Sequence, residues 1–178
     1  MLENDIKKIS VSVEELEKMN KRLGAEISKD YEGKCPMLVG LLKGCLPFMS
    51  DLFKNITIPC TIDYFKVSSY KGTQSTGVIN VKGEVPDVDA KDVIIVDDIL
   101  ETGRTLKAVK ELLFAHGAKS VKVCVLLDKP EGRKYEIDAD YVGGMVPNEF
   151  VVGYGLDYND LYRNLPYVGV LKDEIYSK

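Results

Sequence analysis

The chain has 178 residues, which suits one ordinary domain and is too short for an eight-unit α/β barrel of roughly 250 residues. Apolar residues make up 45% and charged residues 29%, a globular composition that excludes wholesale disorder. The net charge of −4 argues against a sequence-independent nucleic-acid binder. Apolar runs are far shorter than the roughly 18 residues of a membrane span, and MLENDIKKIS has no secretory signal pattern. We expect a single domain over residues 1–178, cytoplasmic, with no membrane or nucleic-acid partner.

The cysteines and the single histidine limit the kinds of site. The four cysteines contain no C-x-x-C pair, which excludes zinc-ribbon and thioredoxin-like spacings. We expect all four to be reduced, with at least Cys124 in a buried strand. His116 stands just before Gly117 at the end of a helical pattern, where a last-turn residue near the helix C-terminus is expected. Catalysis through histidine is therefore nearly excluded.

The first periodic segment is helical. Ser12 and Glu15 form an S-x-x-E capping box, and Leu16, Met19 and Leu23 follow at helical spacing. This pattern predicts an amphipathic helix that ends near the polar run 29–34.

A strand, a helix and a second strand follow. The continuous apolar run 37–42 predicts a buried strand that Lys43 and Gly44 interrupt. Proline fits the first helical turn, so Pro47 is expected to open a helix through Phe53. Residues 61–67 form the next predicted strand. The polar segment 68–77 is either a plain hairpin loop or a lid over a site.

The second half of the chain contains a strand–helix–strand unit. The β-branched run 93–96 predicts a buried parallel strand, and the helix that follows lies between Gly103 and Gly117. The next strand is expected at 121–127, which completes a right-handed βαβ crossover. Further short strands are expected at 141–142 and 167–171. The architecture is α/β, with a parallel sheet covered by helices.

Polar residues cluster in the turn expected after Val96. Asp97, Asp98 and Glu101 follow a central strand at the sheet edge where open α/β sheets bind ligands. A helix then begins, and its free N–H groups together with glycine, hydroxyl and guanidinium groups suit a phosphate monoester; these residues are Thr102, Gly103, Arg104 and Thr105.

Other interpretations of this turn are limited. The Walker A and dinucleotide-binding fingerprints are both absent. A solvated acidic turn with a helix cap remains an alternative. Three neighbouring acids repel one another, so a cation, a sugar diol or a proton is expected beside them.

The segment 93–106, VIIVDDILETGRTL, resembles the ribose-phosphate signature of the type I phosphoribosyltransferases. From about Pro36 to the C-terminus the chain is similar to the hypoxanthine-guanine members of that family. The resemblance implies the type I phosphoribosyltransferase fold, a twisted parallel sheet flanked by helices, with a small hood formed by the terminal segments.

The resemblance also implies roles for the acidic turn. Asp97 and Asp98 would lie under the ribose hydroxyls and the associated Mg²⁺, and the loop 102–105 would hold the nucleotide phosphate. Glu101 would approach N7 of the purine as the general base. The family usually has aspartate at this position, so Glu101 is the main departure of this chain.

Two later motifs match the family's purine site. In LDKP, Lys129 would donate to the purine 6-oxo group, although a lysine before a turn proline is also an ordinary surface residue. In FVVGYGLDY, Phe150 would stack on the purine and the backbone of Val151 would contact the base edge. Core packing is the alternative for Phe150. Asp157 would bind a second Mg²⁺, and Arg163 would contact pyrophosphate.

The fourth match is LKGC at 42–45. In similar proteins this loop, here with Lys43 and Gly44, binds pyrophosphate, and its Leu–Lys peptide can be cis. Ser69 and Tyr70 resemble the closing lid of the family.

The implied reaction is purine salvage. The phosphoribosyl group of phosphoribosyl pyrophosphate would pass to N9 of hypoxanthine or guanine, giving IMP or GMP and pyrophosphate, with Mg²⁺ and in a homodimer or homotetramer. Two alternatives stay open. Because Glu101 departs from the family pattern, the protein could instead be a nucleotide-sensing regulator on the same fold. The enzyme could also prefer another base such as xanthine or a pyrimidine.

Overall fold

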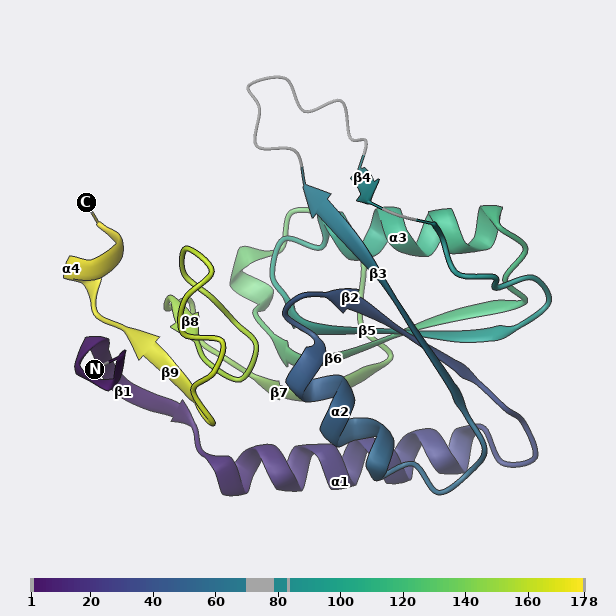
Figure 1. Cartoon of the computed structure of the whole chain (residues 1–178), viewed down its shortest axis with the longest axis horizontal. Coiled ribbons are helices and arrows are strands. Elements are labelled where there is room, and N and C mark those ends of the chain that lie inside the picture. Colours follow the sequence, from purple (N-terminus) through teal and green to yellow (C-terminus); the bar gives the residue numbers. More distant parts are fainter. Residues whose placement is uncertain (1, 70–78, 83, 178) are drawn as a thin grey trace.

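The computed structural model describes residues 2–69, 79–82 and 84–177, and Figure 1 shows two sheets of unequal size. The larger has the strand order β4-β3-β2-β5-β6-β7, and all its neighbouring strands are parallel except β3 and β4. Its strands are β2 (Met37–Leu42), β3 (Thr61–Ser69), β4 (Ile79–Lys82), β5 (Asp92–Leu100), β6 (Ser120–Asp128) and β7 (Tyr141–Met145). The parallel α/β architecture predicted from the sequence is confirmed.

Helices cover both faces of this sheet. Alternate side chains of β5 divide the apolar core, because Ile94 and Val96 pack on one face and Val93 and Ile95 on the other. The first face is covered by α1 (Val13–Asp30) and α2 (Leu46–Lys54), and the second by α3 (Arg104–Ala115). The three predicted helices are confirmed.

The terminal segments form the small hood. The antiparallel sheet β1-β9-β8 joins β1 (Ile6–Val11), β9 (Val168–Leu171) and β8 (Val151–Val152). Figure 1 shows both chain ends on this side of the molecule. Shorter helices complete the chain: η1 (Leu2–Asp5), η2 (Pro130–Gly132) and α4 (Asp173–Tyr176).

Local signals at the helix ends were predicted correctly. Ser12 and Glu15 form the capping box, with Glu15 N–H donating to Ser12 Oγ over 3.3 Å and Ser12 N–H donating to Glu15 Oε2 over 2.8 Å. His116 caps the C-terminus of α3, with Nδ1 lying 2.9 Å from the Leu112 carbonyl oxygen. All four cysteines are free, and Cys124 is buried in β6. None of the helices in the described part of the chain is long and apolar enough to span a membrane.

The predicted strand boundary that matters for the site was wrong. The strand expected at 93–96 continues through Leu100, so Asp97 and Asp98 lie in β5 rather than in a turn after it. The pairing with β6 explains this, because Asp97 lies opposite Val125 and Ile99 opposite Leu127. A strand therefore holds the first two acids in a fixed register.

Candidate active site

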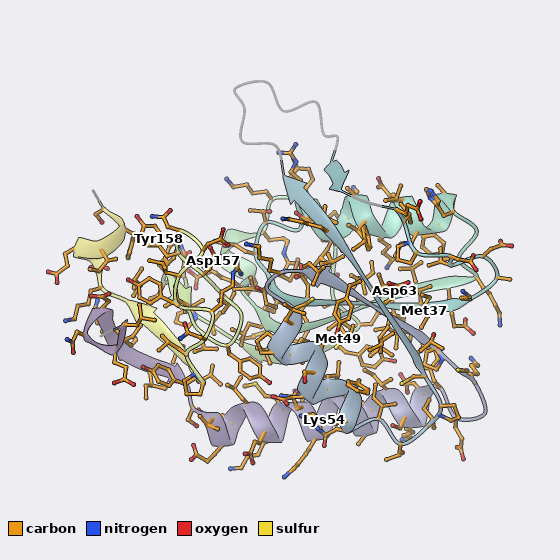
Figure 2. The ribbon with its side chains drawn as sticks, viewed as in Figure 1. Met37, Met49, Lys54, Asp63, Asp157 and Tyr158 are labelled. Atoms are coloured by element: carbon orange, nitrogen blue, oxygen red, sulfur yellow. The ribbon has the colours of Figure 1, made fainter. Side chains whose placement is uncertain are left out.

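The predicted site residues meet where parallel strands of the large sheet end and the hood begins. Lys43 and Gly44 follow β2, the acids lie at the end of β5, and Lys129 follows β6. The segment 150–163 reaches them from the hood, and Figure 2 shows Asp157 and Tyr158 of that segment on the hood side of the molecule. The Leu42–Lys43 peptide bond is cis. The sheet edge thus gathers residues from distant parts of the chain.

The pair Asp97 and Asp98 is half-buried and closely packed. Ile99 N–H donates to Asp98 Oδ1 over 2.8 Å, and Asp98 N–H donates to Asp97 Oδ1 over 3.1 Å. A Cβ atom at Gly44 would lie 1.8 Å from Asp98 Oδ2, so a larger residue there would displace the Asp98 carboxylate. Burial and the Asp98 charge raise the pKa of the Asp97 carboxyl, and burial also raises that of Asp98.

The loop 102–105 has the form expected of an anion site. Gly103 has φ 81° and is the N-cap of α3 without a side-chain cap of its own. Arg104 N–H donates to Thr102 Oγ1 over a long 3.4 Å, and the N–H groups of the first helical turn face the side where an anion can bind. A cavity of about 150 Å³ lies beside it, lined by Asp97, Thr102, Gly103 and Thr105 among others. Arg104 is half-buried at the start of α3. The charge and backbone donors suit a phosphate group.

A second cavity, of about 260 Å³, joins the residues predicted for the purine. Its lining includes Asp98, Glu101, Lys129, Phe150, Val151 and Asp157. Ile99 and Leu156 also line it and were not predicted as site residues. Apolar residues inside strand-like runs give no local signal that their side chains face a ligand cavity.

Lys129 and Glu101 form an ion pair in this cavity. Lys129 Nζ lies 3.0 Å from Glu101 Oε1 and donates to the Glu149 carbonyl oxygen over 3.1 Å. Lys129 is only 7% exposed, so it is not the surface lysine of the alternative interpretation. A buried donor and a carboxylate therefore stand side by side.

Phe150 lies at the cavity wall with two aromatic neighbours. Its ring stacks on Tyr176 with centroids 4.8 Å apart, and it meets the edge of Tyr158 at 5.6 Å. Phe150 remains 36% exposed, which does not fit the alternative of simple core packing. Tyr176 was not predicted, because α4 contacts this ring only through the fold of the hood.

The two cations predicted to bind pyrophosphate, Lys43 and Arg163, both form ion pairs with Asp160. Asp160 Oδ1 lies 3.0 Å from Lys43 Nζ and 3.1 Å from Arg163 Nη2, and these cations lower the pKa of Asp160. Arg163 Nη2 also lies 2.7 Å from Asp157 Oδ1. Asp160 contacts both predicted cations and was not among the residues predicted from the motifs.

The remaining predicted groups are a metal and a lid. Among the described residues no group of three or more His, Cys, Asp or Glu side chains could hold a metal. Two adjacent carboxylates still suit Mg²⁺, which takes one or two of them together with substrate oxygens. Ser69 ends β3, and Tyr70 lies outside the described residues. The strands that flank the polar segment pair antiparallel, with Ser69 opposite Ile79.

The family follows from comparison with known proteins. The model of the phosphoribosyl transferase domain matches residues 12–159, so the chain belongs to the phosphoribosyl transferase family.

Individual relatives define its branch. The chain is 55% identical to hypoxanthine-guanine phosphoribosyltransferase of Streptococcus pneumoniae, over 99% of each chain. Its counterpart in Streptococcus agalactiae is 54% identical over 100% of each chain. The crystal structure of a hypoxanthine phosphoribosyltransferase from Staphylococcus aureus matches with a TM-score of 0.95 and 50% identity, covering 99% of this chain and 97% of that one. These relatives fall in the hypoxanthine-guanine branch that the motifs resemble.

Proposed function

We propose that this protein transfers the phosphoribosyl group of phosphoribosyl pyrophosphate to N9 of hypoxanthine or guanine. The products are IMP or GMP and pyrophosphate. The names of the relatives support this function. The observation that carries it in the structure is the ion pair of the buried Lys129 with Glu101, which lines one cavity with Phe150.

The pair complements one edge of a 6-oxopurine. The 6-oxo oxygen accepts hydrogen bonds, and N7 of the neutral tautomer that can react at N9 carries a hydrogen beside it. Lys129 has only donors and the ionised Glu101 only acceptors, so the two side chains match that edge in order. Adenine presents an amino group in place of the oxo group and leaves the buried lysine without an acceptor. This arrangement favours oxopurines over adenine.

Glu101 also serves the chemistry. The N9 electron pair forms the bond to the anomeric carbon while the bond from that carbon to pyrophosphate oxygen breaks. Positive charge grows on the purine, and the N7 proton passes to the Glu101 carboxylate. Lys43 and Arg163 bind the leaving pyrophosphate, whose negative charge increases during the reaction.

The acids provide for Mg²⁺. We assign Asp97 and Asp98 to one Mg²⁺ and Asp157 to a second, with most other ligands coming from substrate and water. The raised pKa values of the adjacent pair indicate a need for positive charge there. When bound, Mg²⁺ would offset the negative charge of the pyrophosphate and hold the ribose hydroxyls in place. By its resemblance to the lid of the family, the segment with Ser69 and Tyr70 would exclude water from the site.

The test is a Mg²⁺-dependent assay with phosphoribosyl pyrophosphate and four bases: hypoxanthine, guanine, xanthine and adenine. Turnover of hypoxanthine or guanine without adenine supports the proposal, and dominant turnover of xanthine would change the substrate. Folded protein that binds nucleotide without turnover would be a sensor instead. We further infer that the protein is cytoplasmic and forms a homodimer or homotetramer. Light scattering after size-exclusion chromatography tests the oligomeric state.

A further inference from the structure

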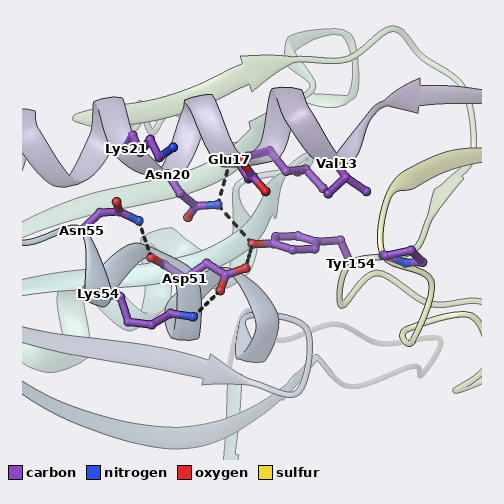
Figure 3. A pocket seen from close by; sticks show the side chains of 10 residues that line it. Val13, Glu17, Asn20, Lys21, Asp51, Lys54, Asn55 and Tyr154 are labelled. Carbon is purple, nitrogen blue, oxygen red and sulfur yellow. Dashed lines mark hydrogen bonds and ion pairs between the residues drawn. The ribbon is translucent and has the colours of Figure 1, made fainter.

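Tyr154 belongs to the active-site segment, yet its side chain points away from the substrate cavities. Figure 3 shows its ring between α1 and α2, at the wall of a cavity of about 340 Å³. The hydroxyl donates to Asp51 Oδ2 over 2.6 Å and accepts from Asn20 Nδ2 over 3.1 Å. Asp51 in turn lies 2.8 Å from Lys54 Nζ. Two helices and the hood segment therefore meet at one phenol oxygen.

Tyr154 and Asn20 are buried in this network, Asp51 is partly exposed, and the donor directions are fixed. Asn20 is 2% exposed, and its Nδ2 also donates to the Leu16 carbonyl oxygen over 2.8 Å, which sets the orientation of the amide. Burial and Asp51 raise the pKa of the Tyr154 hydroxyl, so it remains a donor at neutral pH. Lys54 and Tyr154 keep the pKa of Asp51 below its ordinary value despite partial burial, so the acceptor is ionised. A hydrogen bond to an ionised acceptor is among the stronger ones in proteins.

The main chain around Tyr154 touches the pyrophosphate residues directly. Gly153, Tyr154 and Gly155 have φ values of 98°, 48° and 101°, three successive residues in the left-handed region. A Cβ atom at Gly155 would lie 2.0 Å from the Gly44 carbonyl oxygen, and the Gly155 carbonyl oxygen accepts from Arg163 Nη1 over 2.6 Å. A shift of Tyr154 would therefore move the contacts of both Gly44 and Arg163.

We propose that Tyr154 is a positioning residue for pyrophosphate binding: Asp51 and Asn20 hold its hydroxyl, and this contact fixes the segment 153–163 against the loop 43–44. The inference rests on the proposed function, because it assigns a consequence to binding of the sugar donor. The strained backbone needs such an anchor, since tyrosine with positive φ persists only where surrounding contacts determine it.

The variant Tyr154→Phe keeps the ring and removes the hydroxyl. We expect the KM for phosphoribosyl pyrophosphate to rise about fivefold to twentyfold. This rise is smaller than the full effect of losing a hydrogen bond to a charged group, because the hydroxyl acts on pyrophosphate binding only through the backbone. The KM for hypoxanthine should stay within about twofold, because Glu101 and Lys129 are held by β5 and β6 and do not depend on this anchor. The separation of the two constants distinguishes positioning from general loss of folding.

The chain offers a matched control. Tyr141 at the start of β7 donates its hydroxyl to Asp30 Oδ2 over 2.7 Å and accepts from Lys122 Nζ over 3.1 Å. It thus repeats the tyrosine–aspartate–lysine arrangement without contact to the pyrophosphate loops. Tyr141→Phe should lower the melting temperature but leave both KM values unchanged. An equal rise of the KM for phosphoribosyl pyrophosphate in both variants would overturn the inference.

A second pair of variants changes Asp51, the acceptor of the Tyr154 hydrogen bond. Asp51→Asn keeps an acceptor for the Tyr154 hydroxyl and should stay near wild type, whereas Asp51→Ala should reproduce Tyr154→Phe. Unchanged kinetics in a folded Asp51→Ala protein would refute the positioning role.

Hydrogen exchange separates this inference from the proposed function. The Gly155 amide donates to the Arg163 carbonyl oxygen over 3.0 Å. Faster exchange of this amide in Tyr154→Phe than in Tyr141→Phe is expected even if the wild-type protein proves inactive, and equal exchange in the two variants would oppose the inference. Absent turnover in the wild type counts against the proposed function alone.

Discussion

The role of Glu101 gives the sharpest prediction for the chemistry. Replacing it in Glu101→Gln preserves the side-chain length, and the amide oxygen can still meet Lys129 Nζ, which now lies 3.0 Å from Glu101 Oε1. An amide oxygen cannot take the N7 proton. Loss of a general base costs about 10²- to 10⁴-fold in rate, equivalent to about 2.7 to 5.5 kcal/mol in the activation free energy. We expect that loss in kcat, with a smaller change in the KM for hypoxanthine.

A second substitution separates the length of the Glu101 side chain from its ability to accept a proton. Glu101→Asp keeps the carboxylate but withdraws it by about one carbon–carbon bond, roughly 1.5 Å. The gap to Lys129 would widen to about 4.5 Å, beyond the hydrogen-bond range. Since aspartate keeps a carboxylate that can take a proton, this variant should lose less kcat than Glu101→Gln. Its main effect should be on purine binding, because Lys129 then keeps only the Glu149 carbonyl oxygen.

The assay is steady-state release of pyrophosphate from phosphoribosyl pyrophosphate, with hypoxanthine at saturating concentration. Circular dichroism spectra recorded before and after the kinetic assay confirm that each variant is folded. A fall of kcat under about threefold in Glu101→Gln would show that this carboxylate is not the base, since general-base loss costs far more. Equal losses in the glutamine and aspartate variants would point to reach, and not proton transfer, as the quantity that Glu101 controls.

Three further outcomes are expected. Lys129→Ala should raise the KM for the purine more than that for the sugar donor, in the same pyrophosphate assay, and the reverse order would remove this lysine from the base cavity. Asp160→Asn should lower the inhibition constant of pyrophosphate about twofold to fivefold, because a neutral amide competes less with it for the cations Lys43 and Arg163. Ser12→Ala breaks the capping box and should cost about 1 kcal/mol, with a melting temperature about 2 to 4 °C lower in thermal denaturation and kcat unchanged.

The elements that sequence predicts well are those with local physical causes. A capping box, a helical stripe and an apolar run each act within a few residues, and Ser12 and the strand 37–42 stand as predicted. The strands β1, β4 and β8 were missed. β8 has two residues, and β1 shows no clean alternation of apolar side chains, so both depend on pairing with β9. Such pairing is not visible in a local pattern.

Within the candidate site too, local motifs were predicted and contacts between distant residues were not. Motifs identified Glu101 and Lys129 separately, but only the fold shows that they touch. Tyr154 lies inside a recognised motif, yet its partner Asn20 lies 134 positions away and interrupts the apolar stripe of α1. A buried asparagine in such a stripe is costly without partners, and that cost is the signal that could have singled it out. Its partner could not have been found from the spacing.

The ion pairs among the proposed site residues bear on how substrate would bind. The lysine assigned to the base already has a carboxylate partner, and the two cations assigned to pyrophosphate share Asp160. Substrate binding therefore exchanges one anionic or acceptor partner for another, and it does not remove water from bare cations. Pre-formed pairs also hold the side chains in place, which lowers the conformational entropy lost on binding. The acids that compete with the substrate thus also prepare its site.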